Sequence, residues 1–266
     1  MITCEILGYG ADNNGLGNQM FCIATALGLA YENNDTASFP ELMYPPYDFY
    51  GRTIFHRLNK SPISVKNTYN EPPYTSTIYH KIPYEENMSM RGHFQSYKYF
   101  EKNQEQIVDS FQLPKHIVSR IEKKHEHLLN DLSNKASMHI RRGDYLKLQG
   151  HYASLDSQYY DKALDIAEKE EIVVFSDDIE WCKQNISLGK KKIYFVEGEM
   201  DIVDMYLMSR IPTNIIANST FSWWAAFLNK NKDKKIIGPT QWFGPARTKS
   251  NEIETRDLFP PSWIRI

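Results

Sequence analysis

Residues 135–148, "KASMHIRRGDYLKL", contain a short apolar run, "ASMHI", that stops at two adjacent arginines. Four similar runs follow, many of them rich in β-branched residues: "EIVVFS" (171–176), "KKIYFV" (191–196), "TNIIAN" (213–218) and "KKIIG" (234–238). Between and after them we expect helices at 157–169, 178–184, 201–209 and 220–229. This alternation is typical of a parallel β-sheet covered by helices, so it predicts an α/β fold for the second half of the chain.

The first half of the chain is less regular. "ITCEILGYG" (2–10) predicts a strand that ends in glycines, and helical periodicity starts at about Leu16. Residues 34–83 are rich in proline and tyrosine, which predicts long loops. "RGHFQSYKYF" (91–100) is expected to hold another strand that leads into a loop, and a charged helix is expected at 114–132. The polar stretch after this helix predicts two domains, 1–132 and 133–266.

Composition limits the classes of function. With 31 Lys and Arg against 33 Asp and Glu, the net charge of −2 offers no overall attraction to nucleic acid or an anionic membrane. The three cysteines are scattered, and no apolar run approaches the length of a membrane span, so we expect a cytoplasmic protein without an integral membrane segment. The oligomeric state is not predicted.

A metal site is not expected. The chain has no Asp-x-Asp triplet and no His-Glu-x-x-His arrangement. His125 and His127 fall in the charged helix and are expected to be solvated, as are Glu197 and Glu199 in a loop. We therefore predict a protein without a metal or cofactor.

The tandem arginines follow a predicted strand. Side chains alternate between the two faces of a strand, so one of Arg141 and Arg142 should face a ligand while the other braces the loop. Gly143 permits a tight turn, with Asp144 near enough to pair with an arginine. Arginine suits forked contacts to phosphate. The alternative is an ordinary surface pair of Arg and Asp at a strand end.

A second candidate anion-binding site lies where the run "TNIIAN" meets the next helix. Ser219 or Thr220 is a natural N-cap, and the free backbone N–H groups of a helix start attract anions. Hydroxyl groups of Ser219, Thr220 and Ser222 could add donors. By itself this could be only a capped core helix, but in a parallel sheet ligands bind at the carboxyl ends of the strands. Both features lie at that edge, so together they favour a diphosphate site.

Two further stretches carry polar groups. In "FSDDIEW" (175–181), Asp177 or Asp178 either caps the following helix or accepts N–H groups from a purine such as guanine. In "GLGNQMF" (15–21), the glycines allow close approach to a ligand, with Asn18 and Gln19 projecting polar groups.

Taken together, these stretches resemble the α-1,2-fucosyltransferase family, glycosyltransferase family 11. The central motif, His-x-Arg-Arg-x-Asp-Tyr, is present at 139–145. The other matching stretches are "GLGNQMF" (15–21), "GHFQSYKYF" (92–100), "LDSQYYDKAL" (155–164), "FSDDIEW" (175–181), "NIIANSTFSWWAAFLN" (214–229) and "QWF" (241–243). They span almost the whole chain in order.

The resemblance implies a GT-B-like fold, in which an acceptor-side Rossmann-like half, 1–132, and a GDP-sugar-binding half, 133–266, face a cleft. It also implies transfer of L-fucose from GDP-fucose, with inversion and without a metal ion, to the 2-hydroxyl of a terminal β-galactoside. Two alternatives stay open: an enzyme that uses another GDP-sugar such as GDP-mannose, and a nucleotide- or sugar-binding protein without catalysis.

The resemblance also implies roles for residues. Arg141 would bind the β-phosphate, and Arg142 would hold the loop through Asp144. His139 would lie beside the guanine, which Asp177 or Asp178 would read. The implied donor-binding residues are Asn18, Gln19, His139, Asp177, Asp178, Asn218, Ser219, Thr220, Phe221 and Ser222. A general base is left open between Asp144 and Asp12.

Overall fold

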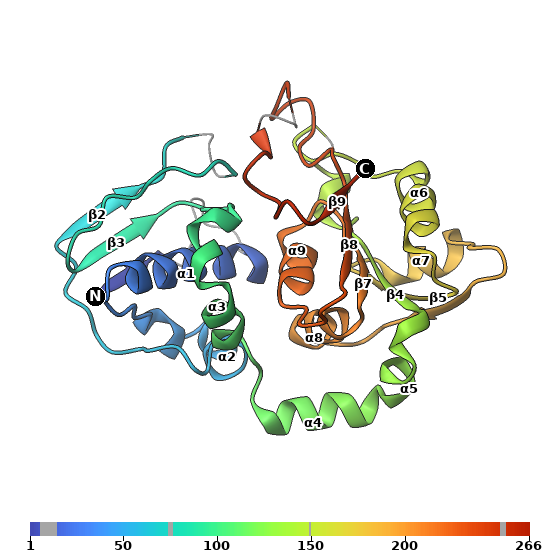
Figure 1. Ribbon diagram of the computed structural model, residues 1–266, viewed down its shortest axis with the longest axis horizontal. Helices are drawn as coiled ribbons and strands as arrows, with labels where there is room; N and C mark the ends of the chain where they lie inside the picture. Colours follow the sequence, from blue (N-terminus) through green and yellow to red (C-terminus); the bar gives the residue numbers. More distant parts are fainter. Residues whose placement is uncertain (6–14, 74–76, 149, 251–253) are drawn as a thin grey trace. The chain divides into compact units, whose positions relative to one another are not determined.

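The computed structural model describes residues 1–5, 15–73, 77–148, 150–250 and 254–266 (Figure 1). The chain forms two units, each compact in itself. One unit is Met1–Val118 with Glu254–Pro260, and the other is Ser119–Ile253 with Pro261–Ile266. The domain ranges predicted from the sequence, 1–132 and 133–266, have other bounds than these two units and stay a prediction.

The second unit contains a six-stranded sheet in the order β6-β5-β4-β7-β8-β9. Its strands are β4 (Lys135–Ile140), β5 (Glu171–Ser176), β6 (Lys192–Phe195), β7 (Thr213–Ile215), β8 (Lys235–Gly238) and β9 (Ile264–Arg265). Every neighbouring pair is parallel. The predicted parallel sheet is therefore confirmed, with β9 as an added edge strand that the apolar runs did not indicate.

Helices cover both faces of this sheet (Figure 1). They are α6 (Ser157–Ala167), α7 (Ile179–Asn185), α8 (Asp201–Arg210) and α9 (Thr220–Phe227), at the predicted places with slightly different ends. Strand β4 is buried along its whole length and alternates between the two faces. Met138 and Ile140 pack in the core cluster that α6 and α7 complete, whereas the ring of His139 lies beside Phe221 of α9.

The first unit contains a three-stranded parallel sheet in the order β1-β3-β2. Its strands are β1 (Ile2–Cys4), β2 (Asn67–Asn70) and β3 (Met88–Arg91), beside the buried helix α1 (Leu16–Glu32). The remaining elements are short: η1 (Pro40–Met43), α2 (Asp48–Arg52), η2 (Tyr97–Tyr99), η3 (Glu101–Asn103) and α3 (Gln104–Ser110). Strand β3 ends where the predicted strand at 91–100 begins, so most of that motif is loop.

The charged helix expected at 114–132 is two helices, α4 (Lys115–Lys124) and α5 (Glu126–Leu129), which precede η4 (Leu132–Asn134). The prediction that His125 and Glu199 are solvated is wrong. The imidazole Nε2 of His125 lies 2.9 Å from Glu199 Oε1, and each side chain is 9% exposed. Lys124 pairs with the same carboxylate at 2.5 Å. The break between α4 and α5 turns His125 inward, while His127 and Glu197 are exposed as expected.

No helix in the described ranges is both long enough and apolar enough to cross a membrane.

Candidate active site

Two arginines and two aspartates lie side by side at the carboxyl ends of β4 and β5. The register pairs Ile140 with Ser176, so Arg141 and Asp177 follow at the same edge of the sheet. Arg141 Nη1 lies 3.1 Å from Asp177 Oδ2, and Arg142 Nε lies 3.1 Å from Asp178 Oδ2. The backbone N–H of Arg142 also donates to Asp177 Oδ1 at 2.9 Å. The two loops are thus joined by three contacts between neighbouring strand ends.

Asp144 completes the surroundings of Arg141. Its Oδ1 accepts a hydrogen bond from Arg141 Nη2 at 2.6 Å, so Asp144 is paired with Arg141 and the expected pair of Asp144 with Arg142 is wrong. Asp144 is three positions after Arg141 and begins the short helix η5 (Asp144–Leu146), so the turn between them brings the two side chains together. The buried Nε of Arg141 has no hydrogen-bond partner among the described residues.

Gly143 is required by a close approach between the two loops. A Cβ atom at this position would lie 2.3 Å from Asp177 Oδ2, far inside van der Waals contact. With any larger residue, the Asp177 carboxylate, which pairs with Arg141, would have to shift. The glycine therefore fixes how closely the loop after β4 lies against the loop after β5.

Arg142 is held by helix α7. Its guanidinium carbon lies 3.4 Å from the centre of the Trp181 ring, which is a close cation–π contact. Asp178 is the N-cap of α7 and accepts a hydrogen bond from the backbone N–H of Trp181 at 3.3 Å. Asp178 thus caps the helix and binds Arg142 at once. Arg142 is thus held against α7, whereas Arg141 pairs with the carboxylates of Asp144 and Asp177. The predicted division of roles, with Arg141 on the ligand and Arg142 as the brace, stays a prediction.

His139 is buried two residues before Arg141, with 4% of its surface exposed. Burial lowers its pKa to about 3, and the nearby positive charge of Arg141 adds to this effect. The imidazole is therefore neutral at ordinary pH. Its ring centre lies 5.6 Å from that of Phe221, which joins β4 to the start of α9. A neutral, buried His139 can pack or hydrogen-bond but cannot carry positive charge to a phosphate.

Helix α9 starts at the carboxyl end of β7, as predicted. Ser219 is the N-cap, and its hydroxyl accepts a hydrogen bond from the backbone N–H of Phe221 at 3.3 Å. The hydroxyl of Ser222 is turned back to the carbonyl groups of Ala217 and Ser219, at 3.4 and 3.3 Å. The structure thus brings Ser219, Phe221 and Ser222 together at one helix start, with Thr220 as its first residue.

Asn218 connects three loops. Its amide group donates to the carbonyl oxygens of Ala153 and Trp242, at 2.9 and 3.0 Å, and its own carbonyl accepts from the hydroxyl of Tyr145 at 2.9 Å. Both N–H groups of the Asn218 side chain are therefore used within the protein. In this arrangement Asn218 organises the loops around the site, which is a different use from the implied contact to the donor.

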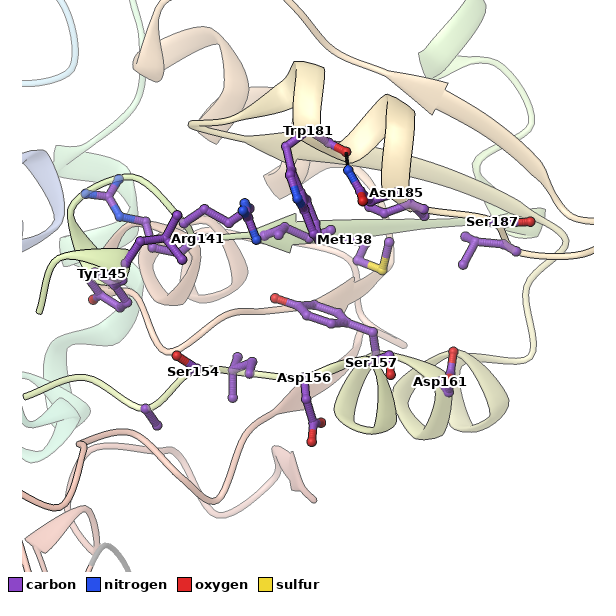
Figure 2. Close-up of a pocket in the computed structure, with 18 residues that line it drawn as sticks. Met138, Arg141, Tyr145, Ser154, Asp156, Ser157, Asp161, Trp181, Asn185 and Ser187 are labelled. Atoms are coloured by element: carbon purple, nitrogen blue, oxygen red, sulfur yellow. Dashed lines mark hydrogen bonds between the residues drawn. The ribbon is translucent and has the colours of Figure 1, made fainter. Parts of the chain in front are cut away.

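A pocket of about 200 Å³ opens beside the arginines (Figure 2). Trp181 and Asn185 of α7 line one side, and Ser157 and Asp161 of α6 line the other, as Figure 2 shows. The rest of the lining is Met138, Ile140, Arg141, Arg142, Tyr145, Leu146, Ala153, Ser154, Leu155, Asp156, Tyr160, Ile186, Ser187 and Leu188. Aromatic walls with a few polar groups and two arginines suit a flat polar ligand that carries negative charge.

The sequence-predicted residues of the N-terminal glycine loop lie in the first unit. Asn18 and Gln19 are in the first turns of α1, which starts after Gly15. Asn18 Oδ1 accepts a hydrogen bond from the Gln95 side chain at 2.9 Å, so Asn18 is tied to the loop after β3. Asp12 lies outside the described residues.

Some residues of the site were missed from the sequence. Trp181, Tyr160 and Asp156 contribute to the pocket, and Tyr145 stacks on Tyr152 with ring centres 4.0 Å apart. Trp181 could have been predicted, because it is three positions after Asp178. If Asp178 is the N-cap of a helix, Trp181 lies in the first turn, beside the cap. Tyr152 could not, since its contact depends on how the long loop folds.

Within the described ranges, no group of three or more His, Cys, Asp or Glu side chains is arranged to hold a metal ion.

The family model described as "Glycosyl transferase family 11" matches residues 11–266. The chain belongs to glycosyl transferase family 11. Among its relatives, "Alpha-1,2-colitosyltransferase" of Escherichia coli is 32% identical over 287 aligned positions, which cover 95% of this chain and 96% of that protein. "Galactoside alpha-(1,2)-fucosyltransferase 2" of Oryctolagus cuniculus is 25% identical, and the match covers 94% of this chain and 74% of that protein.

Solved structures support the fold of this family 11 chain. The fucosyltransferase NodZ from Bradyrhizobium aligns with a TM-score of 0.55 at 14% identity, over 84% of this chain and 90% of NodZ. A NodZ structure described as soaked with GDP-fucose gives the same TM-score of 0.55. The predicted α/β, GT-B-like fold is therefore confirmed. The predicted cleft between its halves stays a prediction.

Proposed function

We propose that this family 11 glycosyltransferase moves L-fucose from GDP-fucose to the 2-hydroxyl of a terminal β-galactoside, with inversion and without a metal ion. The observation that carries the proposal is the position of Arg141, which follows β4 at the sheet edge where α9 also begins. Parallel sheets bind ligands at this edge, and a guanidinium next to a helix N-terminus suits a diphosphate.

The reaction needs negative charge to be stabilised as GDP leaves. A bond forms between the acceptor oxygen and the anomeric carbon of fucose, while the bond from that carbon to the β-phosphate oxygen breaks. The electron pair of the broken bond goes to the phosphate. In the proposed mechanism, Arg141 and the N–H groups at the start of α9 stabilise this charge, and fixed donors of this kind are worth about 3–4 kcal/mol each.

The pocket beside the arginines gives the nucleoside a place. A guanine ring is flat and has two N–H donor groups on one edge, and the pocket offers the aromatic faces of Trp181 and Tyr160 with the carboxylates of Asp156 and Asp161. Because Asp178 caps α7 and Asp177 binds Arg141, these two residues hold the proposed phosphate-binding loop. Their proposed contact to guanine would require them to exchange partners.

The general base that takes the acceptor proton is proposed to be Asp144 or Asp12. Asp144 is 53% exposed and pairs with Arg141, so it could act only after the diphosphate has taken that arginine over. The variants Asp144→Asn and Asp12→Asn separate the two: the base is the residue whose loss abolishes turnover but leaves GDP binding intact.

The donor sugar has one specific alternative. The relative with 32% identity is named for colitose, which is fucose without its 3-hydroxyl group. The same phosphate site would serve both donors, and only the groups around C3 of the sugar would differ. A protein that binds GDP-sugars without transfer is the other alternative.

Incubation with GDP-fucose, GDP-colitose or GDP-mannose and a panel of galactosides tests the proposal. We expect GDP release with GDP-fucose and a product whose new linkage is α-1,2. Faster turnover with GDP-colitose than with GDP-fucose would identify colitose as the donor sugar. GDP binding without any transfer would support the non-catalytic alternative.

A further inference from the structure

The two candidate anion-binding elements follow neighbouring strands of the sheet. Strand β4 leads into the loop with Arg141, and β7 leads into the start of α9. The register pairs Met138 with Ile215, so Arg141 and Asn218 follow three residues later at the same edge. A diphosphate that contacts both elements needs them at a fixed spacing, because fixed donors are what a bound anion requires. The contacts that join this loop to the helix start are therefore part of the design of the site.

Tyr145 bridges the loop and the helix start. Its hydroxyl donates a hydrogen bond to the backbone carbonyl of Asn218 at 2.9 Å. Asn218 directly precedes Ser219, the N-cap of α9, so this bond holds the peptide that leads into the helix. Burial raises the pKa of the Tyr145 hydroxyl, and the neighbouring Tyr152 adds to the rise. The hydroxyl therefore keeps its proton and stays a donor at ordinary pH.

The ring of Tyr145 lies beside Arg141. The guanidinium carbon of Arg141 is 5.4 Å from the ring centre, within the range of a cation–π contact. Both residues line the same end of the pocket in Figure 2. Arg141 also pairs with the carboxylates of Asp144 and Asp177, which a diphosphate would have to replace. The ring carries no charge, so it can support the guanidinium without competing with phosphate oxygens for it.

Tyr145 is itself held by a closed circuit of contacts. It stacks on Tyr152, with the ring centres 4.0 Å apart and the planes inclined by 8°. Ala153 follows Tyr152, and its backbone carbonyl accepts a hydrogen bond from the Asn218 side chain at 2.9 Å. The backbone carbonyl of Asn218 closes the circuit at the Tyr145 hydroxyl. A side chain held both at its face and at its hydroxyl is a rigid spacer.

We propose that Tyr145 is a positioning residue of the donor site, which sets the spacing between the Arg141 guanidinium and the start of α9 so that both bind one diphosphate. The proposal rests on the proposed function for the identity of its ligand. Tyr145 would not bind the phosphate itself. Its effect on GDP would pass through Arg141 on one side and through the N–H groups of α9 on the other.

Titration calorimetry with GDP, guanosine and inorganic diphosphate tests this role. Tyr145→Phe keeps the ring and removes the hydroxyl bond, so we expect GDP to bind about 3- to 10-fold more weakly than to the wild type. Tyr145→Leu also removes the ring beside Arg141, and we expect GDP to bind about 10- to 100-fold more weakly. Guanosine, which has no phosphate, should bind Tyr145→Phe as it binds the wild type.

A double-mutant cycle with Arg141 separates positioning from general damage. In an Arg141→Ala background the ring has no guanidinium to support. Tyr145→Leu should then cost no more GDP affinity than Tyr145→Phe costs in the same background. Damage to the fold around Tyr145 would instead make Tyr145→Leu the more costly change with or without Arg141.

Tyr194→Phe is the matched control. The hydroxyl of Tyr194 donates to a carboxylate oxygen of Glu171 at 3.0 Å, and the ammonium group of Lys192 lies 4.7 Å from its ring centre. This tyrosine thus makes the same two kinds of contact as Tyr145. Glu171 begins β5 and so lies at the amino edge of the sheet, opposite the arginines. The variant should bind GDP as the wild type does.

Three results would overturn the inference: GDP affinity of both Tyr145 variants within twofold of the wild type, a loss of guanosine affinity in Tyr145→Phe equal to its loss of GDP affinity, or a greater cost of Tyr145→Leu that persists without Arg141. A wild-type protein that binds inorganic diphosphate in a manner weakened by Tyr145→Phe, but does not bind GDP, would support the inference and contradict the proposed function. Binding of neither GDP nor diphosphate would contradict both.

Discussion

Arg142 lies over the face of Trp181, with its guanidinium carbon 3.4 Å from the ring centre, while Asp178 binds its Nε at 3.1 Å. A side chain held from two directions cannot turn readily toward a ligand. Its neighbour Arg141 pairs with two carboxylates, one of which is more than half exposed. We therefore predict separate roles for the tandem arginines: Arg142 fixes the loop, and Arg141 exchanges its partners for phosphate.

Loss of Arg141 should affect turnover most. For Arg141→Ala we expect kcat to fall about 100- to 1,000-fold, as with the loss of one preorganised donor to a developing anion. Arg141→Lys should restore little, because an ammonium group is a point charge and cannot replace the fork. Steady-state kinetics with GDP-fucose measure both effects. Turnover of Arg141→Ala within threefold of the wild type would refute the assignment.

Trp181 should matter for stability as well as for activity. Trp181→Ala removes the cation–π contact to Arg142, which we expect to lower the free energy of unfolding by about 1–2 kcal/mol. The freed loop should also reduce kcat. Trp181→Phe keeps an aromatic face, so this variant should retain most of the free energy of unfolding and most of kcat. Urea unfolding and kinetics on the same preparations test this prediction, and an alanine variant equal to the wild type in both would contradict it.

A side chain at position 143 should disturb the contact between Asp177 and Arg141. In Gly143→Ala the new Cβ would displace the Asp177 carboxylate and loosen Arg141, so kcat/KM should fall about 10- to 100-fold. If the clash is the cause, adding Gly143→Ala to an Asp177→Ala background should cost much less than it costs in the wild type. Additive losses in this double-mutant cycle would show a different origin.

Asp204 should make the free energy of unfolding depend on pH. Burial raises its pKa from the ordinary 3.8 to about 7, and the negative charges of Glu199 and Asp201 add to the rise. Between these values the folded protein holds a proton that the unfolded chain releases. The contribution of Asp204 is therefore fully present below about pH 4 and is lost as the pH rises through about 7.

Asp204→Asn removes this dependence. At pH 8 the variant should be more stable than the wild type by up to about 4 kcal/mol, and near pH 4 the two should differ little. Denaturant unfolding at a series of pH values measures the difference. Asp165→Asn, which changes an exposed carboxylate on α6, should leave the stability curve unchanged. A constant difference between Asp204→Asn and wild type across pH would contradict the prediction.

The second half of the fold could be predicted because its signals are local. The apolar runs that become β4, β5, β7 and β8 are short and bounded by polar residues, and those of β5, β7 and β8 are rich in β-branched residues, so each could be recognised without its neighbours. Strand β2 could not, because "NTYN" is polar and largely exposed and owes its conformation to pairing with β3.

The location of the candidate site could be predicted from the sequence, but the pairs that its side chains form could not. Strand ends placed Arg141, Asp177 and Ser219 at one edge of the sheet. Which arginine pairs with which aspartate depends on the register of β4 with β5 and on the turn at Gly143, and neither can be read from residue types. The burial of His125 was missed for a similar reason, since it follows from packing against the Glu199 loop.

Binding of GDP and of guanosine to the wild type and to Arg141→Ala, measured by calorimetry, tests the central claim most directly. If Arg141 holds the diphosphate, the wild type binds GDP much more tightly than guanosine, and Arg141→Ala loses most of this difference while its affinity for guanosine is unchanged. Equal affinities of the wild type for GDP and guanosine, or an undiminished preference for GDP in Arg141→Ala, would contradict it.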